Sequence, residues 1–130
     1  KVLSPLKKIS EAAFEIFRQK SGIPAYGIDV DEQHTLLEAN MHYAYQRFKG
    51  CYPGQEVVER ILAYGNGRTP RTLVTLYFPH KNELPAGTPL KTPAGEEAGR
   101  ITSAYYDPHG DQTVVLAYVD WKFKETPLTV

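Results

Sequence analysis

Residues 71–78, RTLVTLYF, decide the fold, because they form a run rich in β-branched and aromatic residues whose side chains alternate between two faces. Two further runs have the same character, ITSAYY at 101–106 and VVLAYV at 114–119, and the DPHGD between them is a turn sequence. Shorter strands are expected at 89–91 and 123–130. Short strands at this spacing predict a small antiparallel β-barrel or sandwich over residues 67–130.

Before residue 67 the apolar residues recur at helical spacing. A first helix is expected to begin at Ser4 and Pro5 and to stop at Gly22. The segment 25–33, with three acids, is expected to be a surface loop. The apolar face expected for the first helix consists of Leu6, Ile9, Ala13 and Ile16.

Two more helices are expected in this half. Thr35 and Glu38 have the spacing of a capping box, which predicts a short helix that ends at Gly50. Another is expected to begin after Gly54 and to end in the Gly-Asn-Gly at 65–67. The apolar sides expected for these two helices are Leu37, Met41, Ala44 and Phe48, and then Val57, Val58, Ile61 and Leu62.

The class is therefore α+β, with a helical half at 1–66 and a β-barrel domain at 67–130. Three helices without a sheet leave their apolar faces uncovered, so the first half is expected to complete a larger upstream domain.

Composition and charge exclude several classes of protein. The chain has 130 residues, 42% of them hydrophobic and 23% charged, which indicates a folded globular domain. Its 15 basic and 15 acidic residues balance, so no positive excess favours nucleic acid or anionic lipid. No apolar run is long enough to span a membrane. The single cysteine, Cys51, cannot form an internal disulfide, and we expect a reducing compartment, the cytoplasm.

Residues 49–56, KGCYPGQE, contain the densest group of special residues. Gly50, Pro53 and Gly54 fix an irregular backbone around the only thiol, just before a helix start. A cysteine beside Lys49 and a helix N-terminus is expected to have a lowered pKa and to be reactive. The alternative is that Cys51 is a small buried apolar residue.

Other candidate sites are weaker. His34, His42, His80 and His109 are scattered without metal-ligand spacing, and surface or loop positions are expected for them. Asp29 and Asp31 lack the additional oxygen ligands of a cation loop. We therefore predict no metal site.

The octapeptide at 49–56 resembles the KGCYxGQE signature of the YgfZ family, folate-binding proteins of iron–sulfur cluster assembly or repair that are related to the glycine-cleavage T-protein. Upstream, Arg18 with Gly-Ile-Pro at 22–24 and LLEAN at 36–40 resemble further segments of that family. The same holds downstream for VVER at 57–60, RTL at 71–73, GRITS at 99–103 and LAYV at 116–119. The resemblance covers nearly the whole chain, as the C-terminal half of such a protein.

The resemblance implies a three-domain, ring-like protein whose last part is a six-stranded barrel. Tetrahydrofolate or a derivative would be its cofactor, bound mainly by an upstream portion. Cys51 would be the functional thiol, and the partners would be folate and iron–sulfur proteins or their assembly factors. Arg18 and Glu38 are candidates for the rim of the folate channel, with solvated helix-face charges as the alternative. The residues around the thiol would be Lys49, Gly50, Tyr52, Gly54, Gln55 and Glu56.

On this interpretation the protein is an accessory factor and not an enzyme. The alternative is a folate-dependent aminomethyltransferase similar to the T-protein. In that family an acidic residue stands at the position of Cys51 and Arg at the position of Gln55, and this sequence departs from both. A third possibility is an interaction module in which the cysteine is inert.

Overall fold

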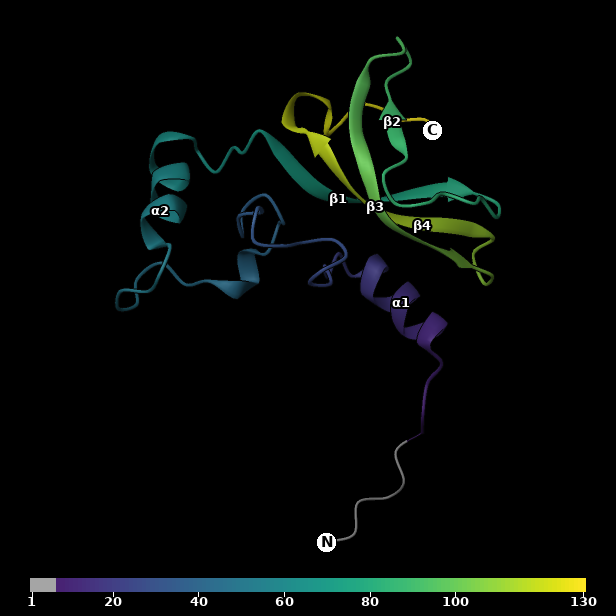
Figure 1. The fold of residues 1–130 in the computed structure, drawn as a ribbon, viewed down its shortest axis with the longest axis horizontal. Helices are drawn as coiled ribbons and strands as arrows, with labels where there is room; N and C mark the ends of the chain where they lie inside the picture. The colour runs from purple at the N-terminus through teal and green to yellow at the C-terminus, as the bar shows by residue number, and fades with distance from the viewer. Residues whose placement is uncertain (1–6) are drawn as a thin grey trace, which may run out of the picture.

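The computed structural model describes residues 7–130 and has the α+β class that the sequence predicts. Figure 1 shows a strongly curved sheet, with α1 beneath it and α2 set apart at the left. The strands expected at 73–78, 89–91, 101–106 and 114–119 are all present. The elements in order are α1 (Glu11–Lys20), the 3-10 turn η1 (His42–Ala44), α2 (Gln55–Tyr64), β1 (Arg71–Pro79), β2 (Pro89–Lys91), β3 (Glu97–Asp107), β4 (Gln112–Asp120) and the 3-10 turn η2 (Trp121–Phe123).

The sheet has the strand order β1-β4-β3-β2, and every pair is antiparallel. Because side chains alternate along a strand, the sheet has two distinct faces. One face carries the main core, and the other carries Leu73, Leu116 and Tyr118. The main core consists of Leu90, Ile101, Val115, Ala117 and Val119, with Phe123 and Leu128 from the C-terminal segment packed against it.

The C-terminal segment differs from the strand expected at 123–130. Its first residue belongs to η2, and in the rest only Thr129 pairs, exchanging hydrogen bonds of 2.8 and 2.9 Å with Lys91 at the edge of β2. Pro127 has no N–H to give to a ladder, which limits pairing here. The segment also faces Leu76–Pro79 of β1 across a cavity of about 560 Å³. It thus lies between the two edge strands and follows the course that would close a barrel.

The first helix begins later than the sequence predicts. Residues 7–10 are not helical, and α1 starts at Glu11, where the Ser10 hydroxyl accepts a 3.2 Å hydrogen bond from Ala13 N–H. Ser10 is the effective cap because its hydroxyl satisfies a free N–H of the first turn. Glu11 adds a favourable negative charge in the same turn. The expected start at Ser4 and Pro5, with Leu6, lies outside the described residues. Gly22, with a φ of +64°, ends the helix as predicted.

The orientation of α1 also differs from the prediction. Its buried residues are Arg18 and Gln19 at the C-terminal end, while Phe14 and Phe17 are exposed. Ile9 is 60% exposed and precedes the helix. The apolar face of α1 therefore does not pack on the sheet.

The second helix predicted from the capping box is wrong, although the box itself forms. Glu38 N–H donates to Thr35 Oγ1 at 3.2 Å, and Thr35 N–H donates to the Glu38 carboxylate at 3.1 Å. A single turn follows and ends at Asn40, whose φ is +55°. There Met41 N–H bonds Leu36 O at 2.9 Å, which is the closing bond of a Schellman motif. The chain then continues irregularly, and Phe48 is 96% exposed.

The third predicted helix is confirmed as α2. Gly54, with a φ of +83°, precedes it, and Gly65 and Gly67 donate backbone hydrogen bonds to Ile61 O at its end. Of its predicted apolar stripe only Val58 is fully buried. The change from helices to strands falls between α2 and β1.

Burial is distributed unequally between the two halves. Most of the buried apolar residues belong to the strands, between Leu73 and Val119. Most of the exposed large apolar side chains precede residue 65, namely Ile9, Phe14, Phe17, Ile23, Tyr26, Ile28, Tyr43, Phe48, Val57 and Tyr64. Over residues 7–130 the protein has no helix with the length and hydrophobicity of a membrane span.

Candidate functional site

The loop that carries Cys51 lies between η1 and α2, and its thiol is exposed and free. The alternative of a buried apolar cysteine is therefore wrong. Gly54 turns the chain into α2, and Arg47, before the loop, forms an ion pair of 2.9 Å with Glu59 on that helix. The backbone around the sulfur is thus held at both ends while the sulfur faces solvent.

The residues around Cys51 form two groups. The Lys49 ammonium lies 4.9 Å from the centroid of the Tyr52 ring, as a cation–π pair. Gln55 and Glu56 lie in the first turn of α2, where Gln55 N–H bonds Tyr52 O at 3.2 Å. Gly50 has open space around its Cα, with no heavy atom within 4 Å of an added Cβ.

A cavity of about 290 Å³ adjoins this loop. The hydroxyl of Tyr52 is buried and has no hydrogen-bond partner in the described part of the chain. Pockets for drug-sized ligands start near this volume, so the cavity lies at the small end of that range. Its lining residues are His34, Thr35, Leu36, Tyr52, Pro53, Gly54, Val57 and Val58.

Arg18 is not the solvated helix-face charge that the sequence alternative described. It is 4% exposed and contacts the carboxylates of Glu15 at 2.6 Å and Asp29 at 2.5 Å, as well as Ile23 O at 2.8 Å. The guanidinium is therefore held inside the protein by two ion pairs and a hydrogen bond. Arg18 is not among the residues that line the cavity beside Cys51.

Asp29 is the centre of this network and was missed by the sequence analysis, which expected a surface loop at 25–33. Its carboxylate is buried and accepts hydrogen bonds from the hydroxyls of Thr102 at 2.5 Å and Ser103 at 2.6 Å, and from Ala25 N–H at 2.9 Å. Burial opposes ionisation, but the hydrogen bonds from Ser103, Thr102, Ala25 and Arg18 outweigh it and lower the pKa of Asp29. The charged pair joins α1 to β3.

Glu38 also has bonded partners. Its carboxylate accepts the hydrogen bond from Thr35 N–H and also lies 3.6 Å from the guanidinium of Arg71 at the start of β1. Its backbone carbonyl accepts a 2.7 Å hydrogen bond from Leu73 N–H. Glu38 thus fastens the segment 35–40 to the sheet edge, and the solvated alternative is wrong here as well.

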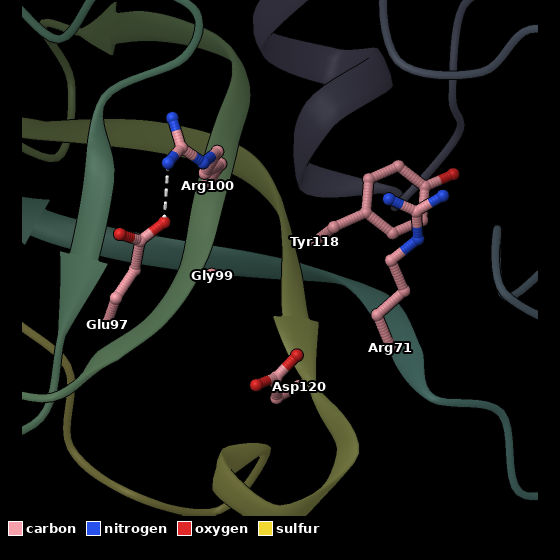
Figure 2. Close-up of a pocket in the computed structure, with 6 residues that line it drawn as sticks. All are labelled: Arg71, Glu97, Gly99, Arg100, Tyr118 and Asp120. Atoms are coloured by element: carbon pink, nitrogen blue, oxygen red, sulfur yellow. Dashed lines mark ion pairs between the residues drawn. The ribbon is translucent and has the colours of Figure 1, made fainter.

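His34 lies in a loop, one of the positions expected for it, and its ring stacks on Tyr118 of β4 with centroids 4.6 Å apart and planes 17° from parallel. Figure 2 shows the Arg71 guanidinium lying over the same Tyr118 ring, 5.2 Å from its centroid. The tyrosine hydroxyl is buried and has no partner within residues 7–130, and burial raises its pKa. No sequence spacing connects these three residues, because they come from a loop and two strands.

Figure 2 also shows a second cavity, of about 300 Å³, over the end of the sheet. Arg100 and Glu97 form a 2.7 Å ion pair on one side of it, and Asp120 lies on the other. Opposite charges alternate around this opening, so its lining offers no net charge to a ligand. The described residues contain no group of three His, Cys, Asp or Glu side chains positioned to hold a metal ion.

No protein-family model matches the chain. It is 29% identical over 108 residues to an aminomethyltransferase of Symbiobacterium thermophilum, an alignment that covers 82% of this chain and 28% of the relative. It is 26% identical over 128 residues to the mitochondrial aminomethyltransferase of Dictyostelium discoideum, covering 94% of this chain and 30% of that protein. A putative chloroplastic transferase of Arabidopsis thaliana is 27% identical over 111 residues, which is 85% of this chain and 24% of the relative.

Among solved structures, the glycine cleavage system aminomethyltransferase T of Bartonella henselae superposes with a TM-score of 0.69 at 24% identity, covering 82% of this chain and 30% of that structure. The chain spans between a quarter and a third of the length of the relatives it matches. It is therefore related in sequence to aminomethyltransferases over most of its length, and it has the fold of the C-terminal domain of the T-protein.

Proposed function

We propose that this chain is the C-terminal part of a tetrahydrofolate-binding protein of the T-protein type. The observation that carries the proposal is the similarity to aminomethyltransferases over more than 80% of the chain, together with the shared fold. Residues 1–66 would complete the folate-binding domain, and residues 67–130 would be its barrel domain. The exposed apolar side chains before residue 65 support this division, because a domain with its own core would bury them.

Tetrahydrofolate would be held mainly by the upstream part, since the cavity beside Cys51 has only about 290 Å³. When bound, folate would supply the one-carbon chemistry. This chain would contribute one wall, formed by Tyr52 and the apolar surface of Leu36 and Val57 beside it.

The first candidate activity is folate-dependent aminomethyl transfer. The names of the similar proteins favour it over the accessory role, because they are aminomethyltransferases or a putative transferase. Its test is turnover by the full-length protein, supplied with tetrahydrofolate and an aminomethyl donor. Product formed at a rate above that of folate and donor alone supports it, and no turnover with folate bound contradicts it.

The second candidate is the YgfZ-type accessory role in iron–sulfur cluster assembly or repair, with folate and cluster proteins or their assembly factors as partners. It is favoured by one observation: the only thiol of the chain, Cys51, is exposed in a KGCYPGQE loop that is anchored at both ends. Its test is the Cys51→Ala variant of the full-length protein, assayed for iron–sulfur enzyme activity in cells. Undiminished activity would remove Cys51 from the function.

The same Cys51→Ala variant separates the transferase from the accessory factor. A transferase in which the thiol is incidental keeps its turnover in Cys51→Ala, whereas an accessory factor loses its cellular effect but still binds folate. The matched control is Cys51→Ser, which keeps a polar atom of similar size at the same exposed position. A free, exposed thiol is stable in a reducing compartment, and we propose the cytoplasm.

A further inference from the structure

Asp31 and His34 form a hydrogen-bonded pair in the loop before Thr35. The Oδ1 atom of Asp31 lies 2.6 Å from Nδ1 of His34, and the backbone nitrogen of Asp31 lies 3.3 Å from the same ring nitrogen. Nδ1 cannot donate to the carboxylate and accept from the backbone N–H at once, and the shorter, charge-assisted contact is the stronger one. A neutral His34 therefore carries its proton on Nδ1 and its lone pair on Nε2.

The orientation of the His34 imidazole is fixed by its surroundings. The ring stacks on Tyr118, a buried residue of β4. Hydrogen bonds from Gln33 N–H and from His34 lower the pKa of Asp31, so this carboxylate is ionised at neutral pH. The imidazole is thus held on one edge by a negative charge and on one face by the sheet.

His34 lines two cavities at once. One is the cavity of about 290 Å³ beside the Cys51 loop, and the other has about 280 Å³ and reaches Tyr26 and Met41. Within residues 7–130, Nε2 of His34 has no hydrogen-bond partner and, unlike the hydroxyl of Tyr52, is not sealed from solvent. Nε2 is therefore an available hydrogen-bond acceptor in the lining that the two cavities share.

The rest of the cavity beside the Cys51 loop is mostly apolar or aromatic. Leu36, Tyr52 and Val57 contribute to it, and its described lining contains no charged side chain. A flat heterocycle would gain apolar contact there, and its ring N–H would donate to the lone pair on Nε2. A phosphate or carboxylate group would instead face that lone pair and the charge of Asp31, which disfavours an anion.

We propose that His34 is the residue through which this chain recognises a nitrogen heterocycle, with Nε2 accepting a hydrogen bond from a ring N–H and Asp31 as the positioning residue. The proposal rests on the proposed function for the identity of the heterocycle, which is the pterin ring of tetrahydrofolate. It assigns the polar contact to a loop residue outside the octapeptide at 49–56.

The tautomer can be tested without any ligand, by nitrogen magnetic resonance of the full-length protein labelled at histidine. At about pH 8, where an ordinary imidazole is neutral, we expect the His34 proton on Nδ1 and a mixture of tautomers in Asp31→Ala. His42 is the internal control, because its Nδ1 faces the hydroxyl of Tyr45 instead of a carboxylate. A His34 proton on Nε2 would overturn the proposal, since that atom could then accept no hydrogen bond.

Binding is tested by calorimetric titration of the full-length protein with tetrahydrofolate. His34→Phe keeps a ring against Tyr118 but has no nitrogen, so we expect about tenfold weaker binding at nearly the same melting temperature. The matched control is His42→Phe, at an exposed histidine that lines neither cavity. If His34→Phe lowers the melting temperature, Asp31→Ala gives the same comparison with the imidazole retained. Affinity equal to that of the unsubstituted protein would overturn the proposal and leave the proposed function intact.

Pterin alone, without the remainder of folate, separates this proposal from the proposed function. We expect pterin to shift the Nε2 resonance of His34 in the full-length protein and to leave that of His42 unchanged. A shift at His34 in a protein without affinity for tetrahydrofolate would contradict only the proposed function. If neither pterin nor tetrahydrofolate shifts the Nε2 resonance, the recognition role of His34 is wrong.

Discussion

At the scale of single residues, Asp29 is a buried charge whose hydrogen bonds and ion pair hold α1 against β3. The strand β3 contains a bulge between Ile101 and Ser103, so that Thr102 is an extra residue in the ladder. Neighbouring strand residues normally point to opposite faces, but a bulge re-aims a side chain. Here both hydroxyls reach the same carboxylate oxygen of Asp29.

Asp29→Asn is expected to destabilise the protein by about 2 kcal/mol, because it removes a buried charge that pairs with Arg18 and leaves Glu15 as the only carboxylate bonded to that guanidinium. The folded pKa of Asp29 lies below its ordinary value of 3.8, so its stabilising contribution is complete above that pH and is lost as the pH falls through the folded pKa. Urea unfolding at pH 7 measures the loss, and the difference from the unsubstituted protein should shrink only below about pH 4. The control is Asp31→Asn, which changes an exposed carboxylate. If both variants lost the same free energy of unfolding, the stabilising role of the buried pair would be contradicted.

Tyr118→Phe is expected to leave stability unchanged or to raise it by about 1 kcal/mol, because it removes a buried hydroxyl that no described residue satisfies. The ring contacts with His34 and Arg71 are retained by phenylalanine. Chemical denaturation of the two proteins compares them directly. A loss of stability would mean that the hydroxyl has a partner.

The sequence predicted the irregular loop around Cys51 but not the buried charges. Gly50, Pro53 and Gly54 are local signals, and they correctly indicated an irregular loop before a helix. The partners of Arg18 and His34 are distant in sequence, at Asp29 and Tyr118, and no local spacing encodes them. Local rules therefore predicted a channel rim or solvent for Arg18 and a surface or loop position for His34, and missed the buried partners of both.

At the scale of elements, the close approach of β3 and β4 depends on Gly99. An added Cβ at this position would lie 2.1 Å from Tyr118 O and 2.9 Å from Val119 Cα. Both atoms belong to the backbone of β4 and have no rotamer to move. Glycine is therefore required where the central strands meet.

Gly99→Ala is expected to destabilise the sheet by about 3 kcal/mol, because the methyl group forces the strands apart. Gly50→Ala is the control, since nothing lies within 4 Å of its Cβ position. Thermal unfolding of both variants measures the difference. A Gly99→Ala protein as stable as the control would show that the strands separate without cost.

Strands could be predicted better than helices in this chain, for a physical reason. The strands carry their own core, so their alternation records burial directly. The turn at Leu36–Asn40 has a correct capping box but stops at Asn40, where a left-handed residue ends it. The apolar periodicity that predicted a helix there lies instead on exposed side chains such as Phe48.

At the scale of the whole molecule, the β half is a finished core and the helical half is not. The sheet buries apolar side chains on both faces, while most apolar side chains of α1 and α2 are exposed or only partly buried. Similar proteins are three to four times as long as this chain by the coverage of their alignments. The account explains both facts by one upstream domain that binds folate and covers the helices.

Titration of the full-length protein with tetrahydrofolate by calorimetry tests this central claim most directly. We expect saturable binding of one folate per polypeptide, and loss of affinity in Tyr52→Ala, which removes a side chain that lines the cavity. The matched control is Tyr64→Ala, at a tyrosine that is 90% exposed. Binding that is unaffected by Tyr52→Ala would remove this chain from the site. A full-length protein that shows no saturable binding of tetrahydrofolate would contradict the account as a whole.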